Sequence, residues 1–211
     1  LWFGTIANTL CLVEQGFLGV NAQQETDYWV CEFGITNGRP GDWRLPEIYV
    51  WDLKEKKLKQ KLLTGPALQA LSTVTGLRAA GNAGGVVFLA GPRLPGFGGG
   101  IVMFAFEAET GDFLGFQAFP TLTDIRSFLT YDGVLYAGVG TDPDLPTDPG
   151  GFVLRWFGDA NDPFDFEIVG TLDSEAANLA VHEGRIYVTT WPVDFDPQRV
   201  MALYQSPKIP P

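Results

Sequence analysis

The sequence predicts an all-β chain made of four repeated antiparallel meanders, the architecture of a β-propeller. Four aromatic-rich segments of alternating character start at residues 48, 102, 152 and 200. The same strand thus recurs about every 50 residues, which is the period of propeller blades. The dipeptides Asp132-Gly133 and Glu183-Gly184 each separate two apolar runs. A Gly-containing pair in that position is a signal of a β-hairpin, because the tight turn needs positive φ angles.

Each repeat is expected to supply a short series of strands. The predicted units span residues 1–65, 66–120, 121–173 and 174–205, followed by a proline-rich tail at 206–211. The predicted strands are 48–53 and 58–63 in the first unit, 77–80, 86–90, 102–106 and 113–119 in the second, 125–131, 134–139, 152–157 and 166–172 in the third, and 178–181, 185–189 and 200–204 in the fourth. Residues 67–72 are the best helical candidate, and they are too few to form a helix without tertiary packing.

The four units leave the closure of the propeller open. They form either a complete four-bladed ring or part of a larger propeller. The strand-like residues 1–7 could pair onto the last unit, which lacks a fourth strand, and close the ring. They could instead form the innermost strand of the first unit. We favour closure by the N-terminal segment.

The segment 102–116, which reads VMFAFEAETGDFLGF, resembles the blade repeat of quinoprotein-like propellers. That repeat has an apolar strand, an Ala-containing turn with Thr-Gly, and a second strand. The resemblance implies a propeller blade. The vicinal cysteines of the quinone-binding enzymes are missing, so no pyrroloquinoline quinone (PQQ) cofactor is expected.

Charge and composition exclude several classes of protein. The net charge is −11, with +1 in residues 1–105 and −12 in residues 106–211, whereas a nucleic-acid-binding protein needs a basic surface. One histidine, His182, and two cysteines cannot build a His-rich zinc site or the C-x-x-C-H attachment of a haem. No apolar run is long enough to span a membrane as a helix.

Two acidic loops are candidate calcium sites. The first carries Asp142, Asp144 and Asp148 between prolines, and clustered carboxylates are the ligands that Ca²⁺ prefers. The second holds a similar set of oxygen donors, namely Asp159, Asn161, Asp162 and Asp165. The alternative is that these residues only form turns, since Asp, Asn and Pro are common turn residues.

The cysteines and one loop tryptophan suggest a setting outside the cytoplasm. Cys11 and Cys31 lie in apolar, strand-like runs, so they either form a disulfide across a hairpin or stay as free buried thiols. A disulfide, together with few lysines, predicts an extracellular, periplasmic or cell-surface location. Trp43 beside Arg44 in a loop predicts a contact with a sugar or a partner protein, because exposed Trp and Arg side chains are frequent at binding surfaces.

No catalytic motif accompanies these features. The sequence therefore favours a non-catalytic extracellular propeller that serves as a protein-interaction or surface-assembly module, with a protein partner or self-assembly. The alternative is a calcium-dependent propeller hydrolase or lactonase. That alternative predicts that Asp124, Glu175 and Asn178 converge from the innermost strands on a central metal.

Overall fold

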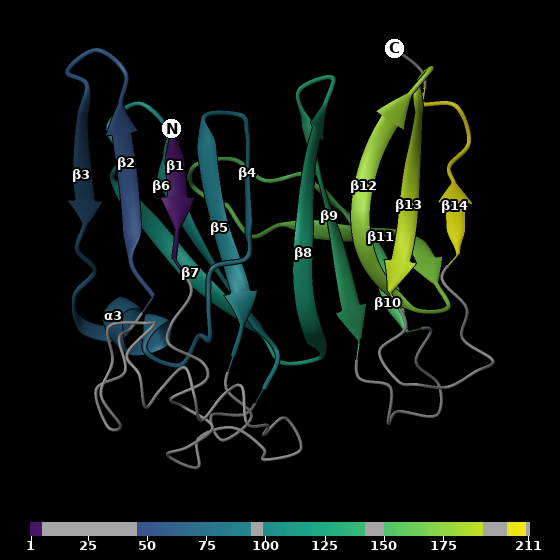
Figure 1. Cartoon of the computed structure of the whole chain (residues 1–211), viewed down its shortest axis with the longest axis horizontal. Helices are drawn as coiled ribbons and strands as arrows, with labels where there is room; N and C mark the ends of the chain where they lie inside the picture. Colours follow the sequence, from purple (N-terminus) through teal and green to yellow (C-terminus); the bar gives the residue numbers. More distant parts are fainter. Residues whose placement is uncertain (6–45, 94–98, 142–149, 192–201, 210–211) are drawn as a thin grey trace, which may run out of the picture.

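The computed structural model describes residues 1–5, 46–93, 99–141, 150–191 and 202–209. These residues form four antiparallel sheets that follow one another along the chain and stand side by side (Figure 1). The predicted all-β class and the four sheets are confirmed. No helix in the described ranges is both long and apolar enough to cross a membrane.

The first two sheets come from the first 119 residues. The first sheet has the order β1-β2-β3, and the second has the order β4-β5-β6-β7. Their strands are β1 (Trp2–Gly4), β2 (Ile48–Asp52), β3 (Lys57–Lys61), β4 (Ala79–Ala83), β5 (Val86–Pro92), β6 (Ile101–Glu107) and β7 (Phe113–Phe119). A short helix, α3 (Gly65–Leu71), joins the two sheets and buries Ala67 and Leu71 against them.

The third and fourth sheets repeat this pattern. The third has the order β8-β9-β10-β11, and the fourth has the order β12-β13-β14. Their strands are β8 (Leu122–Tyr131), β9 (Val134–Thr141), β10 (Gly151–Trp156), β11 (Phe166–Leu172), β12 (Glu175–His182), β13 (Arg185–Trp191) and β14 (Leu203–Gln205). The predicted turns at Asp132-Gly133 and Glu183-Gly184 join β8 to β9 and β12 to β13, and all four turn residues have positive φ.

The first strand of the chain, β1, joins the first sheet. Strands β2, β6, β10 and β14 correspond to one another by their spacing in the chain. β1 pairs antiparallel with β2, with Trp2 opposite Val50. The expected closure, in which the N-terminal strand pairs onto the last unit, is therefore wrong. The alternative, an innermost strand of the first unit, agrees with the described strands, among which β1 is the edge strand on the side opposite β3.

The sheets pack face to face in chain order. The second sheet buries both faces, with Phe104 and Phe106 toward the first sheet and Met103 toward the third. The third sheet buries Val153 against Leu179 of the fourth. Among the described strands, extensive contacts between sheets join successive sheets, and Figure 1 shows the first and last sheets at opposite ends. The described strands thus form an open arc.

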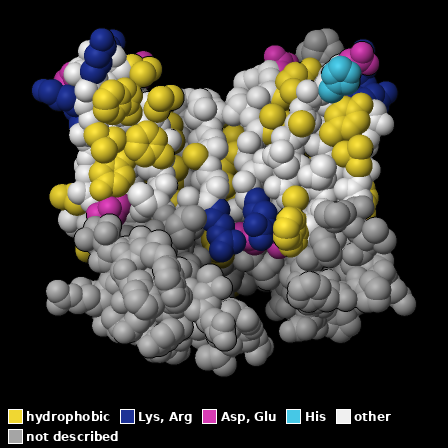
Figure 2. Space-filling model, viewed as in Figure 1, with side chains coloured by type: hydrophobic (Ala, Val, Ile, Leu, Met, Phe, Trp, Pro, Cys, Tyr) yellow, Lys and Arg dark blue, Asp and Glu magenta, His cyan; other side chains and the backbone are white. Residues whose placement is uncertain are grey.

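Among the described residues, only one face of the first sheet packs against another sheet. Trp2 and Ile48 pack toward the second sheet, and the Trp2 ring lies 4.9 Å from that of Phe106. On the opposite face, Phe3, Trp51 and Leu58 are 39%, 36% and 52% exposed. Figure 2 shows hydrophobic side chains gathered over this sheet, at the left of the view. We call this surface the outer face of the first sheet.

Candidate functional site

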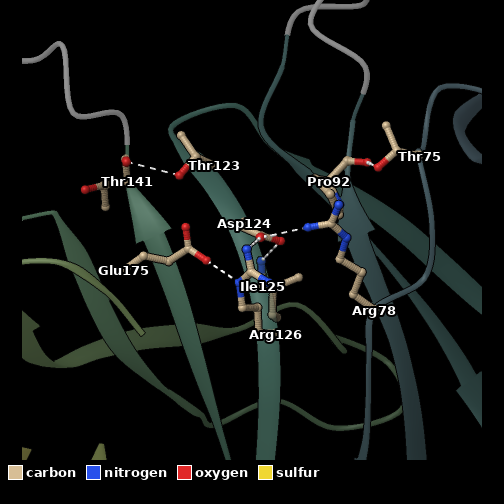
Figure 3. A network of polar contacts seen from close by, with 9 residues as sticks. All are labelled: Thr75, Arg78, Pro92, Thr123, Asp124, Ile125, Arg126, Thr141 and Glu175. Carbon is tan, nitrogen blue, oxygen red and sulfur yellow. Dashed lines mark hydrogen bonds and ion pairs between the residues drawn. The ribbon is translucent and has the colours of Figure 1, made fainter. Parts of the chain in front are cut away.

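A network of charged side chains joins the second, third and fourth sheets (Figure 3). Asp124 on β8 accepts a hydrogen bond at Oδ2 from Nη1 of Arg78 at 3.0 Å, and the same oxygen forms an ion pair with Nη2 of Arg126, also at 3.0 Å. The Nε atom of Arg126 donates to Oε1 of Glu175 on β12 at 2.6 Å. The two carboxylates are buried, with side-chain exposures of 9% and 6%, whereas the arginines are about one-third exposed.

Two irregularities in β8 place Asp124 and Arg126. Leu122 pairs with Thr141 and Ile125 with Val139, so β8 carries one residue more than β9 in this stretch. A second extra residue lies between Ile125 and Ser127. Such bulges turn side chains away from the regular alternation, and they are common beside functional sites. The two charged side chains of β8 belong to these bulged stretches.

Glu175 reaches the network because the residue that faces it on β9, Gly140, has no side chain. A Cβ atom at Gly140 would lie 2.8 Å from Cγ of Glu175 and 2.9 Å from Oγ1 of Thr123. Any side chain at residue 140 would therefore displace the glutamate. Burial raises the pKa of Glu175, and the hydrogen bond from Arg126 only partly offsets this effect.

The geometry bears directly on the predicted metal centre. Asp124 and Glu175 do converge from inner strands, as expected for the hydrolase alternative. Their oxygens, however, accept hydrogen bonds from two guanidinium groups, which hold positive charge where a cation would need to bind. The third expected ligand, Asn178, does not join them, because its Oδ1 accepts from Oγ of Ser127 and from the backbone N–H of Leu179. This donor set suits an ion-pair clamp better than a calcium site.

The exposed side of the clamp offers further hydrogen-bond donors. Among the described residues Arg78 donates to Asp124 through Nη1, and its Nε and Nη2 groups make no hydrogen bond there. The Trp191 ring lies 5.5 Å from Cζ of Arg126 and is 53% exposed. A guanidinium beside an exposed indole is a combination that binds planar anions such as carboxylates. The two arginines and Trp191 were not expected from the sequence, since nothing in the repeat pattern marks them.

The acidic turn after β10 holds one predicted calcium site. Oδ1 of Asp159 accepts hydrogen bonds from the backbone N–H groups of Asn161 at 2.6 Å and Asp162 at 3.0 Å. These two hydrogen bonds lower the pKa of Asp159, and the bond from Asp162 has the larger effect. The same turn presents the carbonyl of Pro163 to Nε1 of the buried Trp156 at 3.0 Å. Within the described ranges no three His, Cys, Asp or Glu side chains form a metal-binding group, so calcium here stays a prediction.

Several predicted residues lie outside the described ranges. They are the cysteines Cys11 and Cys31, the loop pair Trp43 and Arg44, and the acidic residues Asp142, Asp144 and Asp148. The disulfide, the partner contact and the first calcium loop therefore remain predictions. His182 is exposed at the end of β12, and its Nε2 lies 3.7 Å from Oε1 of the exposed Glu183.

Comparisons with known proteins give likenesses among solved structures. No family model matches the chain, and no curated protein sequence does so either. Among solved structures, the Cps50 (Swd1) β-propeller domain of Myceliophteria thermophila is similar, with 10% sequence identity and a TM-score of 0.45. The match covers 70% of this chain and 47% of that domain, so it spans about half of the domain's length. The quinoprotein-like repeat is not confirmed by any of these comparisons.

Proposed function

We propose that the four sheets are consecutive blades of a β-propeller and that the protein is a non-catalytic interaction module outside the cytoplasm. The blade assignment is supported by the chain order of the sheets, their up-and-down meanders and their face-to-face packing. The composition supports the location, through two cysteines that could form a disulfide and the scarcity of lysine outside β3 and its turn.

One observation carries the proposal. The carboxylates that an enzyme would need at the inner strands are held by Arg78 and Arg126. A buried carboxylate that is already paired is a poor metal ligand and a poor general base. The clamp instead ties three sheets together and presents Arg78, Arg126 and Trp191 to solvent. This surface fits a partner that offers a carboxylate, such as an acidic side chain or a chain terminus.

An array of acidic and neutral peptides tests the interaction surface. We expect the purified protein to retain acidic peptides and Trp191→Ala to lose most of that retention. Trp51→Ala is the matched control, because Trp51 is also a partly exposed tryptophan but lies on the outer face of the first sheet. Equal retention by both variants would place the contact elsewhere.

A calcium titration and a lactone-hydrolysis assay test the enzyme alternative. We expect Asp124→Asn and Glu175→Gln to leave calcium binding, measured by calorimetry, unchanged. Calcium-dependent hydrolysis that both substitutions abolish would overturn the proposal in favour of a hydrolase.

A further inference from the structure

Among the described strands, the fourth sheet has one fewer than each of its two predecessors. The second and third sheets each end with a fourth strand, β7 or β11, paired antiparallel with the third. In the fourth sheet, β14 is the third strand and no described strand lies beyond it. A sheet edge of this kind presents unpaired backbone groups to any extended chain.

The backbone of β14 shows which groups are free. Ala202 and Ser206 form backbone hydrogen bonds with β13. The N–H of Thr190 donates to the carbonyl of Ala202, and the N–H of Ser206 donates to the carbonyl of Ile186. In an antiparallel ladder alternate residues point to opposite edges. The N–H and C=O groups of Leu203 and Gln205 therefore point away from β13. Both residues are exposed, and Leu203 is 67% exposed.

A groove lies where the side chains of a further strand would reach. It has a volume of about 440 Å³ and runs between β10 and β11 of the third sheet and the β13–β14 part of the fourth. Its walls are largely apolar, and Val169 on β11 is 50% exposed there. The other apolar walls come from Val153, Leu172, Ile186, Val188 and Tyr204. A strand added beside β14, in the position that β7 and β11 hold in their own sheets, would cover these side chains.

The groove is basic in an acidic part of the protein. Arg155 and Lys208 line it, and no acidic residue does. Residues 106–211 contain only five basic residues against 17 acidic ones, so this pairing is unusual for the region. The Nε atom of Arg155 is buried and has no hydrogen-bond partner in the part of the chain that the structure describes. A buried, unpaired guanidinium nitrogen is costly unless a ligand supplies an acceptor.

We propose that the free edge of β14 binds an extended segment of a partner protein by β-strand addition. The segment runs antiparallel to β14, places alternate apolar side chains in the groove and brings a carboxylate to Arg155. Main-chain hydrogen bonds give such a complex its affinity, and the pockets for alternate side chains give it specificity. This site shares no residue with the Arg78, Arg126 and Trp191 surface, so each proposal can fail without the other.

A fluorescent peptide with the sequence of β11, FEIVGTL, is the probe. It is a natural fourth strand and combines apolar residues with one glutamate. We expect saturable binding to the full chain, measured by fluorescence anisotropy. Gln205→Pro removes the outward N–H and, like Gln205→Ala, the side-chain hydrogen bond to Tyr187, so it should weaken binding about tenfold or more. Gln205→Ala is the matched control: it keeps the N–H and should bind like the wild type.

The carboxylate is tested separately. Replacing the glutamate of the peptide by glutamine should weaken binding to the wild type but not to Arg155→Met. Two results would overturn the proposal: no saturable binding of the glutamate peptide, or equal affinity for the Gln205→Pro and Gln205→Ala proteins. A third would do so too, namely a dimer in light scattering that Gln205→Pro dissociates, because a second copy would then occupy the edge.

Discussion

Arg126 and Glu175 lie 49 residues apart in the chain, yet the Nε atom of one donates to Oε1 of the other at 2.6 Å. This bond joins β8 of the third sheet to β12 of the fourth. Because Arg126 also contacts Asp124, which binds Arg78 beside the second sheet, the charges form one continuous clamp. Three sheets are thereby held at their inner strands.

Removal of Arg126 should be costly. Arg126→Met would leave two buried carboxylates with less compensation, and we expect a loss of about 3 kcal/mol in the free energy of unfolding. Arg126→Lys should recover part of this loss, because lysine keeps the positive charge. The recovery should be incomplete, because the ammonium group lacks the planar geometry with which the guanidinium contacts both carboxylates. Lys59→Met is the control, because Lys59 forms its ion pairs with Asp52 and Glu55 on an exposed turn. Urea denaturation measures all three, and equal losses for Arg126→Met and Lys59→Met would contradict the clamp.

Glu175 should make stability depend on pH. Its pKa is raised in the folded protein by burial, so the unfolded chain releases this proton at a lower pH than the folded one. Stability is thus lost as the pH rises from the ordinary value of 4.5 through the raised folded pKa. We expect the free energy of unfolding of the wild type to fall relative to Glu175→Gln over that interval. Denaturation at several pH values measures the difference; a difference that is flat or grows with pH would exclude the effect, and Glu183→Gln on an exposed turn is the control.

The packing of the third sheet on the fourth depends on a glycine. A Cβ atom at Gly138 on β9 would lie 2.5 Å from Cδ1 of Leu179 and 2.8 Å from Cβ of Ala176, both on β12. Gly138→Ala should therefore destabilise the protein by about 1–3 kcal/mol through overpacking. Gly170→Ala is the control, since its Cβ would meet Val153 at an ordinary 3.6 Å. The two melting temperatures check this, and a smaller drop for Gly138→Ala than for Gly170→Ala would refute it.

The outer face of the first sheet should promote self-association. Phe3, Trp51 and Leu58 form an exposed apolar surface on strands that have no sheet against that face in the described part. Contiguous apolar surfaces of this kind attract other apolar surfaces. We expect the double substitution Trp51→Thr and Leu58→Thr to lower concentration-dependent light scattering with little change in melting temperature, because Thr suits a strand. Unchanged scattering would mean that this face is not the cause.

The sequence predicted the strands well because their signals are local. A period of about 50 residues and Gly-containing turns depend only on neighbouring residues, and the four sheets follow them. The error concerned β1, whose partner lies 44 residues or more further along the chain. A strand of three residues such as β1 contains no local signal that indicates which sheet it joins. Its pairing with β2 could therefore be found only from the structure.

The charged clamp shows the same limit at the candidate site. Under the hydrolase alternative the sequence predicted that Asp124, Glu175 and Asn178 converge from inner strands; the two carboxylates do so, and Asn178 does not. The sequence did not indicate Arg78 and Arg126, which turn the same carboxylates from a possible metal centre into an ion-pair clamp. Bulges decide where side chains of β8 point, and a bulge leaves no clear trace in an alternating pattern.

The sequence by itself thus determined the all-β class, the number of sheets and the acidic character of the second half. These depend on local alternation, turn residues and composition. Only the tertiary structure decided that the described sheets form an open arc, that no described strand pairs with the outer edge of β14 beside the basic groove, and that Arg126 joins Asp124 to Glu175. Each of these depends on which distant segments pack together, because strand pairing and buried ion pairs join residues that are far apart in the chain.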